Sequence, residues 1–248
     1  MALAFIHSRA LMGLRAPAVT VEVHLANGLP SFSLVGLADT EVKEARERVR
    51  SAIQNSGLAF PSNQRITVNL APADLPKDSG RFDLPIALGI LAASGLLDTE
   101  QLAAHEFAGE LSLSGELRAV RGALAMGLAM HTSQTRTRLV LPEANAQEAA
   151  LVPTAEVYAA RHLRDVVARF ALDATQLGDA VHGVVRVTNA RISSGCTTGK
   201  PQAAPAPAYP DLRDVHGQAI AKRALTIAAA GGHSLLLVGP PGTGKSML

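Results

Sequence analysis

The clearest chemical pattern in the sequence is a glycine-rich stretch at residues 239–246. It reads Gly-Pro-Pro-Gly-Thr-Gly-Lys-Ser and matches G-x-x-x-x-G-K-[ST] at every fixed position. Glycines let the backbone curl so that its N–H groups point at phosphate oxygens, and a following helix adds its positive dipole end. We expect these residues to contact the phosphates of ATP: Gly239, Pro240, Pro241, Gly242, Thr243, Gly244, Lys245 and Ser246.

Two side chains in this stretch have distinct expected roles. Lys245 would reach the outer phosphates, and the hydroxyl of Ser246 would bind the Mg²⁺ ion that bridges them. A glycine-rich turn that fits the pattern by chance is the alternative. The apolar run Leu235–Val238, directly before the loop, favours the phosphate site because such loops follow a buried strand.

Hydrolysis needs groups that the sequence does not supply after the loop. An acidic residue on a neighbouring strand, a group that positions water and an arginine from an adjacent subunit are usual requirements. The sequence ends at Leu248, so we expect this chain alone not to hydrolyse ATP. Whether it ends there for a biological reason or by an accident of cloning stays open, and so does its status as an enzyme.

The elements around the loop divide the chain into three parts. Residues 215–230 have a helical pattern, and residues 234–238 predict a short buried strand. Residues 190–210 are rich in Ser, Thr, Ala, Gly and Pro, which is typical of a linker. We therefore predict a domain over 1–172, an extension and linker over 173–210, and the start of a second domain over 211–248.

The first domain is predicted to be mixed α/β and not doubly wound. Its signals alternate between period-2 and helical patterns, and Asn27-Gly28 is a hairpin signal after the first strand. The expected strands are 19–25, 32–37, 66–70, 138–141 and 157–160, and a hairpin is expected over 110–120. The first expected helix is capped by Asp39 or Thr40 and ends at Gly57. Four further helices are expected over 82–93, 122–131, 143–150 and 163–170.

Composition excludes several classes of protein. The formal net charge of +2 and the 3% aromatic content do not suggest a strongly basic nucleic-acid-binding protein. The single cysteine cannot form an internal disulfide, and the eight histidines show no close metal-binding pair. We recognise no signal peptide and no membrane span, and expect a cytoplasmic location.

Longer stretches resemble a known family. The run from Asp211 to Leu225, then Ala-Ala-Ala-Gly-Gly-His233 and the loop, resembles the entry to the AAA+ module of magnesium-chelatase-like ATPases. Residues 32–38 and 69–87 are similar to the ComM (YifB) branch of that family. The resemblance implies a hexameric motor acting on DNA in branch migration during natural transformation, with ATP and Mg²⁺ as cofactors. It also places Val215 and Gly217 beside the adenine.

The first domain also resembles the proteolytic domain of Lon. Residues 76–78, 109–115 and 139–143 carry that resemblance. Lon needs a serine nucleophile activated by a lysine base. The lysine position aligns with Ala125, so the dyad is absent. Lys77 and Ser79 are the substitute pair to consider, but we interpret them as turn residues with a solvated lysine and predict a non-catalytic domain.

Charged residues elsewhere leave two interpretations open. Lys43, Arg46, Arg48 and Arg50 alternate with glutamates on one helix, and Glu44 precedes Arg48 by four residues, which favours a solvated, self-paired face over a DNA contact. For the whole chain, the main hypothesis is the front part of a DNA-translocating ATPase. The alternative is a non-enzymatic interaction module whose nucleotide loop is a vestige.

Overall fold

The computed structural model describes residues 2–36, 40–75, 77, 80–133, 137–173, 183–187, 212–240 and 242–245. It divides the chain into two compact units, Met1–Gly195 and Cys196–Leu248, which are treated separately below. Within the described residues, no helix has both the length and the apolar character needed to cross a membrane.

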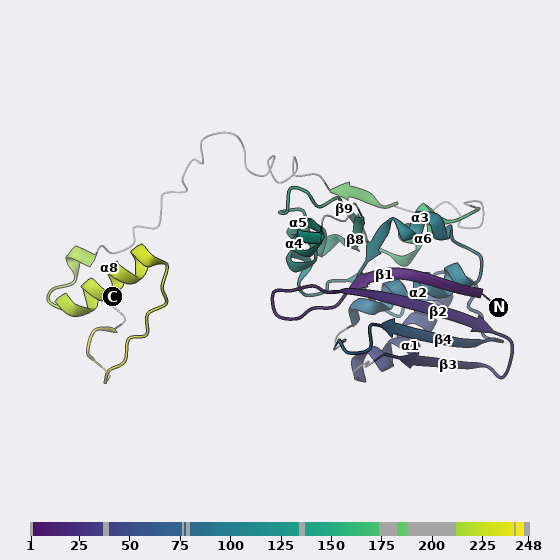
Figure 1. Ribbon diagram of the computed structural model, residues 1–248, viewed down its shortest axis with the longest axis horizontal. Helices are drawn as coiled ribbons and strands as arrows, with labels where there is room; N and C mark the ends of the chain where they lie inside the picture. The colour runs from purple at the N-terminus through teal and green to yellow at the C-terminus, as the bar shows by residue number, and fades with distance from the viewer. Residues whose placement is uncertain are drawn as a thin grey trace. The chain divides into compact units, whose positions relative to one another are not determined.

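The first unit is built on a mixed sheet whose strands follow the order β10-β9-β8-β5-β1-β2-β4-β3 (Figure 1). The pairs β1–β2, β2–β4 and β9–β10 are antiparallel and the others are parallel. This arrangement confirms the predicted mixed α/β class. The strands are β1 (Ala2–Arg9), β2 (Ala18–Ala26), β3 (Ser31–Val35), β4 (Arg65–Ala71), β5 (His105–Phe107), β8 (Arg138–Pro142), β9 (Val157–Ala160) and β10 (Val185–Val187).

Helices pack on this sheet. They are α1 (Thr40–Asn55), α2 (Asp83–Ala93), α3 (Thr99–Ala103), α4 (Ala123–Ser133), α5 (Glu143–Ala149) and α6 (Leu163–Phe170), with a 3-10 turn, η1 (Gly80–Phe82), before α2. The predicted hairpin over 110–120 is confirmed, with β6 (Glu110–Leu111) antiparallel to β7 (Leu117–Arg118). Most predicted boundaries agree with the structure to within a few residues.

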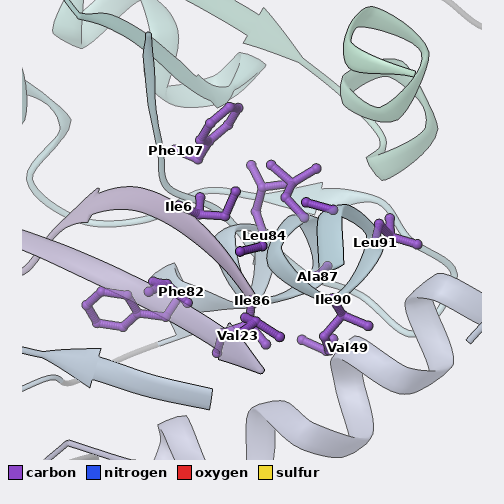
Figure 2. Packing of buried hydrophobic residues seen from close by; sticks show 14 of the residues in the cluster. Ile6, Val23, Val49, Phe82, Leu84, Ile86, Ala87, Ile90, Leu91 and Phe107 are labelled. Carbon is purple, nitrogen blue, oxygen red and sulfur yellow. The ribbon is translucent and has the colours of Figure 1, made fainter. Parts of the chain in front are cut away.

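Helix α2 is the centre of the main hydrophobic core. All of its residues are buried, as expected for a helix that is apolar all round. Figure 2 shows its side chains Leu84, Ile86 and Ile90 among apolar groups from the sheet and α1, including Val23 and Val49. Burying each such side chain contributes about 1.5–3 kcal/mol. A second cluster lies between α4, α5, β8 and β9.

The hairpin prediction at Asn27-Gly28 is wrong. Strand β2 is hydrogen-bonded to β1 on one side and to β4 on the other, so that neither edge is free for β3. Strand β3 instead pairs in parallel with β4, and α1 makes the crossover between them (Figure 1). A local turn signal cannot exclude this arrangement, because the competing partner β4 is distant in sequence.

Four elements of the first unit have no counterpart in the sequence prediction: β1, α3, β5 and β10. In β1, Ala4 and Ile6 are buried while Leu3 and Phe5 are 56% and 50% exposed, so that apolar residues occupy both faces and conceal the strand period. Strands β5 and β10 are too short to show a period. Strand β10 lies within the predicted extension 173–210 and pairs with β9.

The second unit contains a 3-10 turn, η3 (Leu212–Asp214), and the helix α8 (Ala219–Gly231). The helix begins later than predicted because Gly217 and Gln218 have φ angles of +71° and +56°, outside the helical region. The predicted strand 234–238 is absent from the described residues, and Leu236 and Val238 are 84% and 86% exposed. A strand requires a hydrogen-bonded neighbour, which the described part of this unit does not provide.

Candidate nucleotide-binding site

The glycine loop has the backbone form that its sequence pattern requires. Gly242 and Gly244 have φ angles of +86° and +77°, a region that residues with a Cβ rarely adopt. A Cβ added at Gly242 would meet no atom within 4 Å, so the surface there is open. Successive N–H groups in such a loop form a concave, anion-binding surface, which fits a polyphosphate.

The side chain of Lys245 folds back over the loop. Its Nζ donates to the carbonyl oxygens of Gly239 and Pro240, both at 2.7 Å, and lies 3.3 Å from Oγ1 of Thr243. That hydroxyl in turn donates to the carbonyl of Pro240 at 2.9 Å. The ammonium therefore lies at the loop, where it can exchange these carbonyl oxygens for phosphate oxygens as acceptors.

The segment Val215–Gly217 is brought next to the loop by a residue that the sequence analysis missed. Nε2 of Gln218 donates to the carbonyl of Thr243 at 2.8 Å, which ties the start of α8 to the loop. Val215 is buried, and its carbonyl accepts a hydrogen bond from Nζ of Lys222. No sequence pattern singled out Gln218, because its role depends on a contact with a residue 25 positions away.

Two of the predicted phosphate residues, Pro241 and Ser246, lie outside the described residues. The role of Ser246 as a Mg²⁺ ligand therefore stays a prediction. Across the described ranges, no group of three or more His, Cys, Asp or Glu side chains could hold a metal ion. His216 and His233 are exposed, and Cys196 lies in a part of the chain that the structure does not describe.

In the first unit, the interpretation of Lys77 as a solvated lysine is wrong. Its side chain is buried, and its Nζ donates to the carbonyl of Pro72. Burial lowers the pKa of Lys77, and the nearby carboxylate of Asp74 partly opposes that effect. Ser79 is outside the described residues. Ala125 lies on α4 and packs against the second core cluster, where its methyl group offers no base.

The interpretation of the α1 charges as self-paired is also wrong at Arg48. Its Nε donates to Oδ2 of Asp83 at 2.7 Å and its Nη2 to Oδ1 at 3.2 Å, so the principal partner comes from α2 and not from Glu44. The carboxylate of Asp83 is fully buried and also accepts from the amide of Leu111. Burial raises the pKa of Asp83 to about 6, although the Arg48 contacts oppose the rise.

Two arginines in the second half of the first unit are engaged with carboxylates. Arg161 pairs with Glu143 at 2.7 Å, and Arg138 lies 3.4 Å from Glu156. Each of these two arginines therefore has a carboxylate partner that offsets its charge.

Comparison with known proteins relates both units of the chain to magnesium chelatases. A family model described as subunit ChlI of Mg-chelatase matches residues 21–145, and a second, magnesium chelatase subunit ChlI, matches residues 211–248. The chain is 50% identical to competence protein ComM of Haemophilus influenzae, 46% identical to YifB of Salmonella typhimurium and 44% identical to YifB of Escherichia coli. Each match covers 100% of this chain but 45% of the relative.

The fold and the loop together define an α/β protein with a candidate phosphate-binding loop in a second unit. The family matches show that the chain belongs to the magnesium-chelatase ChlI-like family, in the branch of ComM and YifB. It spans slightly less than half the length of the curated relatives that it matches.

Proposed function

We propose that this chain carries the ATP-phosphate and Mg²⁺ site of an AAA+ ATPase. The observation that supports this most strongly is the conformation of the glycine loop. Gly242 and Gly244 have left-handed φ angles, and the ammonium of Lys245 lies 2.7 Å from the loop carbonyls. In this proposal the loop amides and Lys245 bind the β- and γ-phosphates, Ser246 binds Mg²⁺, and Val215 and Gly217 flank the adenine.

We propose in addition that the first unit is a Lon-like domain without protease activity. The resemblance aligns Ala125, whose methyl group packs against the second core cluster, with the catalytic lysine of Lon, and the buried ammonium of Lys77 donates a hydrogen bond to the carbonyl of Pro72. The domain would then serve as a scaffold or an interaction surface.

For the whole protein, we propose a hexameric motor that acts on DNA. The family match supports the ATPase class, and the relative in Haemophilus influenzae is named a competence protein, which supports a role in the handling of incoming DNA. This chain alone would bind the nucleotide without hydrolysing it, because the acidic and arginine groups that hydrolysis needs are not among the residues assigned to the site.

Nucleotide binding by the full chain tests the proposal. Fluorescence of N-methylanthraniloyl-ATP would be measured with and without Mg²⁺ for the wild type, Lys245→Ala and Arg223→Ala. Arg223 is an exposed cation of the same unit and serves as the matched control. A charge-assisted hydrogen bond is worth about 1.5–3 kcal/mol, so Lys245→Ala should weaken binding by about 10- to 100-fold.

Two results would count against the proposal. One is the absence of any binding by the wild type at millimolar nucleotide, which would favour an interaction module with a vestigial loop. The other is equal weakening by Lys245→Ala and Arg223→Ala, which would indicate that only the net charge of the unit matters.

A further inference from the structure

A hollow on the first unit combines aromatic rings with arginines. It has a volume of about 260 Å³ and lies between α1, the start of β3 and the turn that leads into β4. Figure 1 shows α1 beside β3 and β4 at the β3 edge of the sheet. Phe32, Arg46, Arg50, Phe60 and Gln64 are among its lining residues. The family matches assign no role to this surface.

The aromatic part of the hollow packs on the main core. The ring centroids of Phe32 and Phe60 are 6.3 Å apart, and both rings are half-buried against the main core. The guanidinium carbon of Arg50 lies 5.7 Å from the centroid of Phe60, close enough for a cation–π interaction. The chain has six phenylalanines, two tyrosines and no tryptophan. Two half-exposed aromatic rings in one hollow are therefore a large share of the aromatic side chains in this protein. A planar group can stack on rings and on guanidinium planes.

The charge at the rim of the hollow is positive. Arg46 and Arg50 lie four residues apart on one face of α1, and Arg65 stands opposite Ser31 in the β3–β4 register. Glu47 is the carboxylate among the lining residues. Among the residues that the structure describes, Arg50 and Arg65 have no carboxylate partner. The local excess of positive charge suits a phosphate backbone.

A second hollow continues from the first. It has a volume of about 330 Å³ and shares Phe60, Pro61 and Gln64 with its neighbour. The side chains of Asn27 and Asn63 add amide groups along it. Phe60 therefore stands between two hollows, so that the surface can follow a chain of more than one planar unit.

We propose that these two hollows bind single-stranded DNA, with bases against the Phe60–Arg50 pair and phosphates at Arg46 and Arg50. The proposal rests on the proposed function for the choice of DNA as the polymer. The single-stranded form follows from the geometry, because the bases of a duplex are already stacked on one another and cannot enter a hollow lined by half-buried rings. A duplex would meet only the arginines.

Fluorescence anisotropy of a fluorescein-labelled 20-nucleotide oligo-dT tests this with the full 248-residue chain, over a series of NaCl concentrations. The key variant is the double substitution Arg46→Gln and Arg50→Gln. The matched control is Arg161→Gln with Arg186→Gln, whose side chains are 63% and 60% exposed in the same unit and carry the same charge. Phe60→Leu tests the stacking surface.

The arginine double variant should bind about tenfold more weakly, and its salt dependence, log K against log [salt], should be shallower by about 1.4, since each lost phosphate contact removes about 0.7 for a single strand. Phe60→Leu should bind at least about fivefold more weakly with an unchanged slope. The control should stay within about twofold of the wild type. Thermal unfolding of each variant establishes that it is folded. If Phe60→Leu is not folded, the double substitution of the solvent-exposed Arg46 and Arg50 still tests the proposal.

The inference is overturned if the arginine variant binds like its control, or if a duplex of the same length binds as tightly as the single strand. Absence of oligonucleotide binding by the wild type at low salt overturns it as well. The ATP-analogue measurement separates this result from the proposed function. Loss of nucleotide binding with intact oligonucleotide behaviour refutes only the proposed function, and the reverse pattern refutes only this inference.

Discussion

Asp83 and Arg48 form an ion pair whose carboxylate is fully buried, and this pair should make the stability of the first unit depend on pH. Burial raises the pKa of Asp83 from 3.8 to about 6 despite the bond from Arg48. The folded protein therefore holds this proton at a pH where the unfolded chain has already released it. The contribution of Asp83 to the free energy of unfolding is highest below pH ~4, falls as the pH rises to about 6 and is constant above that. By linkage the fall amounts to about 3 kcal/mol.

Replacing Asp83 by Asn isolates this effect, because the amide approximates the protonated acid at every pH. The unfolding free energies of the wild type and Asp83→Asn would be measured by urea denaturation, followed by circular dichroism, between about pH 4 and 7. The free energy of unfolding of the wild type minus that of the variant should fall by about 2 kcal/mol across this range, since part of the full change of about 3 kcal/mol lies below pH ~4. A flat difference, or one that rises with pH, would refute the reasoning, because it would mean that Arg48 fully compensates the burial of the charge.

A control with the opposite sign is available at Asp98. This residue caps α3, and its Oδ1 accepts from the amides of Glu100 and Gln101 at 3.0 and 3.2 Å. Hydrogen bonds from Gln101 lower the pKa of Asp98. Its contribution to stability is thus present above about pH 4 and is lost as the pH falls further. The difference in the free energy of unfolding between the wild type and Asp98→Asn should stay nearly constant over the pH range in which the difference for Asp83→Asn falls.

The remaining predictions concern packing and charge in the first unit. A Cβ at Gly89 would lie 2.5 Å from Cγ2 of Val23, so Gly89→Ala should lower the free energy of unfolding by about 1–3 kcal/mol despite the better helix propensity of alanine, as measured by urea denaturation. Glu106 pairs with Arg9 at 2.5 Å with both side chains 6% exposed, so Glu106→Gln should cost about 3–5 kcal/mol in the same assay. Breaking an exposed pair with Glu143→Gln should cost less than about 1 kcal/mol, and equal costs would contradict the assigned burial.

The candidate nucleotide loop could be found from sequence because its chemistry is local. Left-handed backbone at Gly242 and Gly244, and a lysine close behind them, are properties of adjacent residues that a pattern can record. The contact from Gln218 to Thr243 could not be found in this way, because it joins residues 25 positions apart. The strand expected before the loop failed for a related reason, since a strand is a property of a pair of segments.

The sequence by itself determined most helices and strands of the first unit, its mixed α/β class and the position of the glycine loop, because hydrophobic period and turn chemistry are short-range signals. Only the tertiary structure decided the rest. It placed β3 beside β4 and not beside β2, buried Lys77, and paired Arg48 with Asp83 and not with Glu44. In each case several partners were compatible with the local pattern, and the choice among them depended on which distant surface could bury the most apolar area and satisfy the charges within it.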